Sequence, residues 1–137
     1  MLPTLCACSK LRRSARIISG IYDEELAPSG FSVAQFSLLR MLQKAGPSSL
    51  TALAEATGND RTTLNRNLRP LEEAGLVRSS RGADRRARIV CITDEAKVRM
   101  RSAQPLWEKA QARIEQSLGA DRQPLFTILD KIEELRR

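Results

Sequence analysis

Two short helix-forming segments separated by one glycine turn constrain the fold of this chain more than any other feature. The first, residues 50–57, ends at Gly58, and the second, residues 61–74, ends at Gly75. Each follows residues that commonly cap helices: Ser48 or Ser49, and Asn59 or Asp60. The second carries leucines one helical turn apart: Leu64, Leu68 and Leu71. Two short helices joined by a tight turn predict a helix-turn-helix.

Two β-prone segments follow directly, residues 76–80 and 87–93, on either side of the polar loop 81–86. They predict a hairpin with a charged tip, in which Val90 and Ile92 share one face and Cys91 lies on the other. A hairpin appended to a helix-turn-helix predicts a winged helix. The helix expected over residues 61–74 contains Pro70. Proline lacks a backbone donor and so conflicts with a regular helix, and we expect a bend near it.

Amphipathic helices flank this unit on both sides. One covers residues 8–22, another follows Ser32, and a long one with an expected kink at Pro105 follows Thr93. The long helix has an expected apolar face of Val98, Leu106, Trp107, Ala110, Ile114 and Leu118. A last helix ends near residue 135. The fold class is therefore mainly α with a small β-hairpin wing.

The positive charge of the chain is concentrated in its middle. The 137 residues carry a net charge of +7, and residues 61–93 hold eight arginines against three acidic residues, a net of +5. Arginine presents a planar set of donors that suits phosphates and guanine edges. The placement therefore predicts an anionic polymer as partner, with residues 31–93 as the DNA-binding domain.

The outer helices expose wide apolar faces that a unit of this size cannot bury alone. We expect residues 1–30 and 94–137 to form a helical dimerisation region, so that the protein is a homodimer. A two-fold dimer would place two recognition helices about 34 Å apart, which suits a pseudo-palindromic site on double-stranded DNA.

Several classes of function are excluded or disfavoured. The chain contains no histidine, which rules out a histidine-based catalytic triad, a histidine zinc site and a histidine pH switch. Its apolar runs fall well short of the roughly 18–20 residues that span a bilayer, and residues 1–8 lack the pattern of a secretory signal. We expect a cytoplasmic protein without a membrane partner, a cofactor or a metal.

Three stretches in order resemble the MarR family of bacterial transcription regulators. They are residues 53–63 (LAEATGNDRTT), 71–77 (LEEAGLV) and 84–93 (DRRARIVCIT). The last contains the family's wing pattern at Asp84, Arg86, Ile92 and Thr93. The chain departs from the family at Arg81, where an aspartate is common, and at Ala96, where a glycine often lies nearby. The resemblance covers nearly the whole chain and implies a winged helix-turn-helix with dimerisation helices at both ends.

The resemblance implies that residues 61–74 enter the major groove of DNA. Arginine can bond guanine, asparagine can bond adenine, and threonine can contact a thymine methyl or a phosphate. The candidate DNA contacts on this helix are Arg61, Thr62, Thr63, Asn65, Arg66 and, to phosphate, Arg69. In the wing, Arg86 would enter the minor groove with Asp84 as its ion-pair partner. Arg81, Arg85 and Arg88 would contact the DNA backbone or solvent.

The resemblance also implies an effector, a small aromatic acid or phenol that lowers DNA affinity. The candidate pocket residues are Tyr22, Phe31, Phe36 and Trp107, with Arg13 or Arg16 facing a carboxylate. The alternative is that these aromatic side chains are ordinary core. A regulator of this kind would be a bacterial repressor, associated with the nucleoid when bound to DNA.

Cys6 and Cys8 offer a second kind of signal. Basic residues near a helix N-terminus favour the thiolate, so this pair is a candidate sensor of oxidants. Two such pairs in a dimer could form an intersubunit disulfide or a soft-metal site. The alternative is that both are reduced, inert side chains. A thiol- or peroxide-handling enzyme is a further alternative, but no motif of such enzymes is present, and we expect no catalytic residue.

Overall fold

The computed structural model describes residues 6–81 and 87–136. These residues form six helices and three short strands, in the order α1 (Ala7–Leu26), α2 (Val33–Ala45), β1 (Ser48–Ser49), α3 (Leu50–Thr57), α4 (Arg61–Glu73), β2 (Val77–Arg81), β3 (Arg88–Ile92), α5 (Asp94–Leu118) and α6 (Arg122–Glu134). Two 3₁₀ turns, Ala27–Ser29 and Gly119–Asp121, join α1 to α2 and α5 to α6. The expected fold class, mainly α with a small wing, is confirmed.

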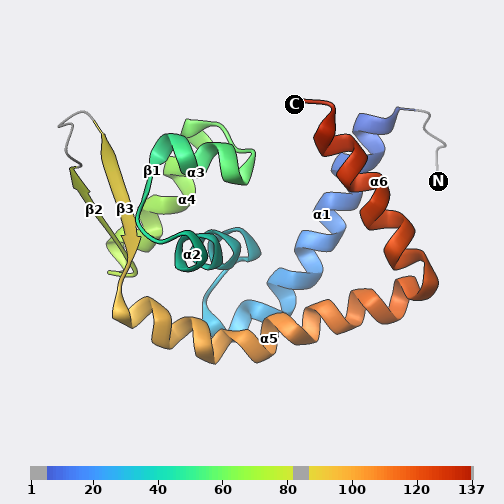
Figure 1. Cartoon of the computed structure of the whole chain (residues 1–137). Helices are drawn as coiled ribbons and strands as arrows, with labels where there is room; N and C mark the ends of the chain where they lie inside the picture. The colour runs from blue at the N-terminus through green and yellow to red at the C-terminus, as the bar shows by residue number, and fades with distance from the viewer. Residues whose placement is uncertain (1–5, 82–86, 137) are drawn as a thin grey trace.

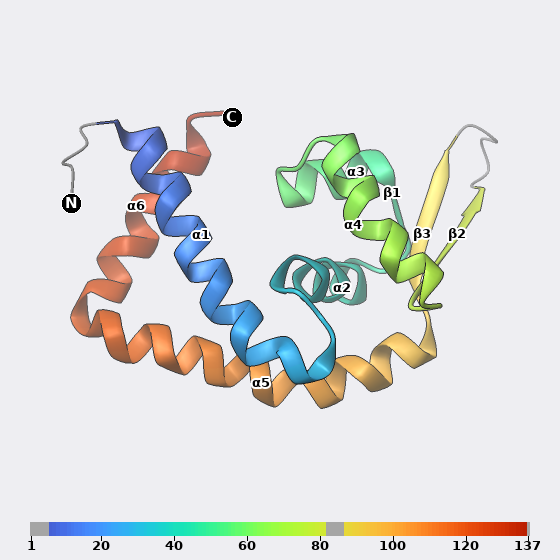
Figure 2. The same ribbon diagram turned by 180° about the vertical axis from the view of Figure 1, so that it is seen from behind.

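The long helix α5 forms the base of the molecule, and two groups of elements rise from it (Figure 1). At one end stand α2, α3, α4 and the sheet, and at the other end stand α1 and α6 together with both chain termini (Figure 2). Ion pairs help to hold α1 against α5. The Glu25 carboxylate of α1 lies 3.0 Å from the Arg113 Nη1 and 3.6 Å from the Lys109 Nζ, both on α5. The described helices include none that is long and apolar enough to cross a membrane.

Side-chain caps set the starts of α2, α3, α4 and α5, as the sequence predicts. The Ser32 hydroxyl accepts from the Gln35 backbone, and the Gln35 side chain accepts from Ser32 in return, which completes a capping box on α2. Asp60 accepts from the Thr63 backbone at 2.7 Å, and this bond holds the pKa of the Asp60 carboxyl below its ordinary value. The helix α4 then continues through Pro70 to Glu73, so the proline does not end it.

The sheet has three strands, one more than the two-stranded hairpin predicted from the sequence. The order is β1-β3-β2, and both pairings are antiparallel. The short strand β1 consists of Ser48 and Ser49, which carry no alternating apolar pattern that could announce a strand. Val90 is fully buried and Ile92 packs against the core. Cys91 lies on the other face, with its sulfur 3.7 Å from the Arg78 carbonyl oxygen, as predicted.

One core joins the leucine face of α4 to α2, the sheet and the first half of α5. Leu64, Leu68 and Leu71 are at most 2% exposed. The buried residues of α5 are Ala96, Met100, Ala103 and Ala110. Val98 was expected on this face but is 53% exposed, because two residues of helix from Met100 amount to more than half a turn. The helix α5 continues through Pro105 and is curved along its length (Figure 1).

The helices α1 and α6, which we call the two arms, leave apolar side chains exposed to solvent. No residue of α6 is buried, and α1 buries only Leu26. The large exposed apolar residues of the arms are Leu11, Ile17, Ile18, Phe126, Ile128 and Ile132, with Leu135 at the C-cap of α6. These side chains form stripes at helical spacing, a pattern that another protein surface usually covers.

We predict that Thr93→Val destabilises the fold by about 1–2 kcal/mol. The Thr93 hydroxyl accepts from the Ala96 backbone at 3.2 Å and donates to the Gly75 carbonyl at 2.8 Å, so it caps α5 and holds the end of α4. Urea unfolding would measure the change. Thr93→Ser should keep most of the stability. Thr127→Val is the matched control, since that exposed hydroxyl bonds only within α6, and a similar loss there would contradict the linking role.

Candidate nucleic-acid interface

The exposed face of α4 forms one wall of a cleft of about 630 Å³ beside the wing. The cleft is lined by Thr62, Asn65, Arg66, Arg69, Pro70, Glu72, Glu73 and Arg88. Four of the six expected contact residues on α4 therefore meet in one place. Arg61 is exposed at the start of the helix, and Thr63, half-buried, lies outside the cleft lining. The predicted wing residues Asp84, Arg85 and Arg86 lie outside the described residues.

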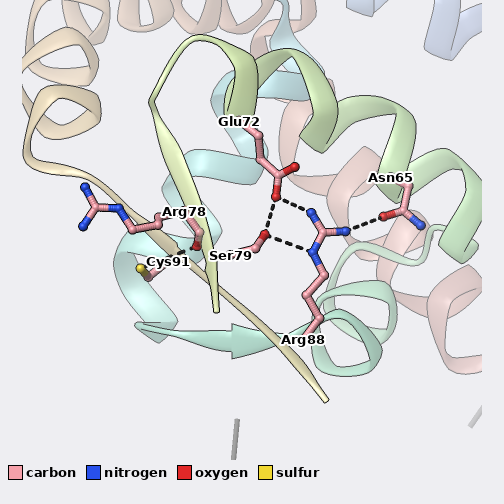
Figure 3. A network of polar contacts seen from close by, with 6 residues as sticks. All are labelled: Asn65, Glu72, Arg78, Ser79, Arg88 and Cys91. Atoms are coloured by element: carbon pink, nitrogen blue, oxygen red, sulfur yellow. Dashed lines mark hydrogen bonds and ion pairs between the residues drawn. The ribbon is translucent and has the colours of Figure 1, made fainter. Parts of the chain in front are cut away.

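Arg88 joins the wing to the recognition helix. Its guanidinium pairs with the Glu72 carboxylate of α4, its Nε donates to the Ser79 hydroxyl at 2.9 Å, and its Nη1 donates to the Asn65 Oδ1 at 3.2 Å. Ser79, on β2, in turn donates its hydroxyl hydrogen to Glu72. Figure 3 shows these four side chains converging between α4 and the two wing strands. Arg88 is therefore engaged within the protein and is not simply solvated, which was one of the two roles expected for it, and a contact to the DNA backbone stays a prediction.

Glu72 is ionised in this cluster. The Ser79 hydroxyl lowers the pKa of the Glu72 carboxyl most, Arg88 lowers it further by hydrogen bonding and by charge, and partial burial opposes both. The carboxylate therefore offsets the charge of Arg88. Arg61, Arg66 and Arg69 are exposed on α4 and supply the positive charge of its outer face.

A second cleft, of about 670 Å³, lies where α1, α2 and α5 meet. It is lined by Ile18, Ser19, Tyr22, Val33, Ser37, Arg40, Met41, Gln43, Lys44 and Trp107. Two of the expected pocket residues, Tyr22 and Trp107, are among them, with ring centroids 6.4 Å apart. Burial raises the pKa of the Tyr22 phenol, Glu115 raises it further, and Arg40 opposes both effects.

The other expected pocket residues lie elsewhere. Phe31 and Phe36 are buried in the core, so the alternative of ordinary core packing is correct for them. Arg13 and Arg16 are exposed and do not line the cleft. Arg13 lies nine residues from Tyr22, or two and a half helical turns, and therefore on the opposite side of α1. Arg40 on α2 takes the place expected for them, with its guanidinium 4.0 Å from the centre of the Trp107 ring.

Comparison with known proteins identifies the fold family. Residues 31–98 match a family model described as HVO_A0114. The solved complex of the M. tuberculosis transcriptional regulator MosR with DNA is 36% identical, with 96% of this chain and 99% of MosR covered and a TM-score of 0.82. The transcriptional repressor CouR, solved on a 23-mer DNA duplex, is 27% identical, with 93% and 92% covered and a TM-score of 0.82. MosR and CouR are MarR-family regulators. The chain belongs to the MarR family.

A curated relative agrees with this assignment. The Bacillus subtilis (strain 168) protein YwoH, an uncharacterized HTH-type transcriptional regulator, is 32% identical over 87 residues. That match covers 64% of each protein, so the chain spans somewhat less than two thirds of YwoH. The resemblance to MarR regulators expected from the three motifs is confirmed, and MosR, CouR and YwoH are all transcriptional regulators by description.

The MarR motifs gave no sign that Glu72 and Ser79 belong to the interface. Glu72 lies within the family-like stretch 71–77, but its partner Arg88 is 16 residues away, and Ser79 looks like an ordinary strand residue. Only the pairing of β2 with β3 behind α4 brings them together. Arg40 did have a signal, since it lies four residues after Phe36 and so on the same side of α2.

The N-terminal cysteines are both exposed, and Cys6 is the N-cap residue of α1. Hydrogen bonds from Ser9, by its side chain and then its backbone, lower the pKa of the Cys6 thiol. The direction is the expected one, but its cause is Ser9 rather than the basic residues nearby. Within residues 6–81 and 87–136, no group of three or more Cys, Asp or Glu side chains is placed to hold a metal ion.

We predict that Glu72→Gln lowers the free energy of unfolding by about 1 kcal/mol at neutral pH. Arg88 loses its charge partner, and the partial exposure of both side chains limits the loss. The pKa of Glu72 is lower in the folded chain than the roughly 4.3 of an unfolded one. Its contribution is therefore complete above about pH 5 and is lost as the pH falls through the folded-state pKa.

Urea unfolding of the wild type and the variant at neutral and acid pH would measure this difference. Glu73→Gln is the matched control, because Glu73 is the exposed neighbour on the same helix. A difference that stays the same at every pH would show that packing, and not the charge of Glu72, is responsible.

Proposed function

We propose that this chain is a sequence-specific DNA-binding transcription regulator, a homodimeric repressor that releases DNA on a small-molecule or oxidant signal. One observation carries the proposal: Thr62, Asn65, Arg66 and Arg69 gather on the exposed face of a helix whose other face is buried in the core. A rigid helix that presents hydrogen-bond donors on one face suits the major groove. MosR and CouR, both solved with DNA, support the choice of partner.

The residues of α4 divide into two kinds of contact. Arg61, Thr62, Thr63, Asn65 and Arg66 lie in the first two turns, where a recognition helix meets base edges. Arg69 lies a turn further on and suits a phosphate. In the wing, Arg86 would enter the minor groove with Asp84 as its partner, and Arg85 would contact the backbone. Residues 31–93 would form the DNA-binding domain.

The uncovered apolar faces support a dimer. The exposed side chains of α1 and α6, among them Ile17, Ile128 and Ile132, need a partner surface, and a second copy of the same helices supplies one. Residues 1–30 and 94–137 would then form the dimerisation region. CouR is described as a repressor, and that description supports the same sign of regulation for this chain. We place the protein in the bacterial cytoplasm, at the nucleoid when it is bound to DNA.

The cleft between α1, α2 and α5 is the proposed effector site. Trp107 and Tyr22 offer aromatic walls, and Arg40 and Lys44 offer positive charge, so the site suits an aromatic carboxylate or a phenolate. Because α1 and α5 belong to the proposed dimerisation region and α2 to the proposed DNA-binding domain, an occupant would contact both parts. Cys6 and Cys8 are the proposed alternative sensor, for an oxidant or a soft metal, and the exposure of both thiols supports it.

We predict that Arg69→Ala weakens binding to every DNA sequence by a similar factor. A phosphate contact carries no base information, so the slope of log affinity against log salt should fall by about 1. Fluorescence anisotropy over a range of salt concentrations would measure both effects. Arg12→Ala is the matched control, since Arg12 is exposed on α1, outside the proposed DNA-binding domain. An unchanged affinity and slope in Arg69→Ala would contradict the assignment of Arg69.

We predict that 4-hydroxybenzoate binds the α1–α2–α5 cleft and lowers DNA affinity. Trp107 is the single tryptophan of the chain and lines the cleft, so its fluorescence reports binding directly. Arg40→Met should weaken this binding about tenfold or more, because the carboxylate loses its charged partner. Arg16→Met is the matched control, an arginine of α1 that does not line the cleft. Equal binding by both variants would contradict the site.

The same DNA-binding assay distinguishes the thiol signal. Peroxide should release DNA from the wild type and from Cys91→Ser, but not from Cys6→Ser or Cys8→Ser. Release that persists in both N-terminal variants would remove these cysteines from the proposal.

A further inference from the structure

The Asn65 amide has a fixed orientation. Arginine carries only hydrogen-bond donors, so the atom of Asn65 that faces the Arg88 Nη1 at 3.2 Å must be the carbonyl oxygen. The amide nitrogen therefore points away from Arg88, as Figure 3 shows. No such constraint can be seen from the spacing of residues along α4.

Arg88 is held on three sides and so acts as a fixed partner. Glu72 offsets its charge, Ser79 accepts from its Nε at 2.9 Å, and Asn65 accepts from its Nη1. Strand pairing adds a further restraint, because Arg88 lies opposite Arg81 at the end of the β2–β3 ladder. Turning the guanidinium toward a DNA phosphate would break all three side-chain contacts and leave Glu72 without its cation.

This arrangement changes what Asn65 can read. An asparagine that recognises adenine uses both ends of its amide: the oxygen accepts from the N6 amino group and the nitrogen donates to N7. The oxygen of Asn65 already accepts from Arg88, so an adenine N6 donor would have to share this oxygen with the guanidinium. The hydrogens on the amide nitrogen remain for a base. Guanine presents two acceptors in the major groove, N7 and O6, and has no amino group there.

We propose that Arg88, held by Glu72 and Ser79, is a positioning residue that makes Asn65 a hydrogen-bond donor, so that Asn65 selects guanine over adenine. The inference rests on the proposed function, since it requires α4 to lie in the major groove. It replaces the expectation that Asn65 reads adenine. It also gives a wing strand a part in major-groove recognition that its own position would not provide.

The experiment begins with selection of binding sites from a pool of random duplex DNA by the wild-type protein. The base read by Asn65 is the one whose preference disappears in Asn65→Ala. We expect guanine there, and its replacement by 7-deazaguanine, which lacks the N7 acceptor, should weaken wild-type binding about tenfold but leave binding of Asn65→Ala unchanged. Arg88→Met frees the amide oxygen and should shift the preference at this one position toward adenine by a similar factor.

Arg78→Met is the matched control. It removes one arginine from the paired wing strand, but Figure 3 shows the Arg78 side chain directed away from the cluster. Arg78→Met should weaken binding to all DNA sequences alike and leave the base preference at the Asn65 position intact. If Arg88 had a merely structural role, Arg88→Met would show this same pattern.

The two levels of the proposal fail in different ways. If the wild type enriches no sequence from the pool, the proposed function fails and the inference fails with it. If a sequence is enriched but Arg88→Met keeps the wild-type preference, only the inference fails. Should Arg88→Met not fold, the base analogues decide on the wild type alone. Adenine at the Asn65 position, with binding weakened by loss of its N6 amino group, would overturn the inference.

Discussion

The burial of one face of α4 is the constraint on which the rest of this structure depends. Leu64, Leu68 and Leu71 are almost completely inaccessible to solvent, so the helix cannot rotate about its axis without exposing them. That fixed rotation turns the polar residues between them outward as a set. It also places Glu72, one residue after Leu71, at the edge where the wing strands pass. The core thus determines both the surface proposed to face DNA and the contact that joins it to the wing.

Much of this arrangement could be predicted from the sequence, because its causes are local. Helix starts depend on a capping side chain and its neighbour three residues later, as at Ser32, Asp60 and Thr93. Leucine spacing identifies the buried face of α4 in the same way. Contacts between residues distant in sequence could not be predicted. The strand β1 exists only because β3 offers it an edge, and Ser79, Glu72 and Arg88 meet only when the sheet has formed.

The cleft between α1, α2 and α5 shows the same division between composition and geometry. Two of the four aromatic residues expected to line a pocket, Tyr22 and Trp107, line this cleft, because hydrophobicity does not distinguish a side chain in the core from one that lines a cleft. Phe36 is fully buried, whereas Trp107, whose ring centroid lies 6.4 Å away, is only partly buried and has the Arg40 guanidinium over its ring. The cation came from α2 rather than α1, because helical phase, not distance along the chain, decides which residues face one another.

Charge counted along the sequence therefore differs from charge available to a ligand. The net of +5 in residues 61–93 treats every arginine as equivalent. In the fold, Glu72 takes up the charge of Arg88, while Arg61, Arg66 and Arg69 remain exposed on α4. The engaged arginine does not lose its function through this pairing, because a guanidinium held by a carboxylate has one orientation and can impose one on its neighbour. In the proposed complex with DNA, the free arginines would supply attraction to phosphate, and the paired arginine would supply the geometry that sequence selection requires.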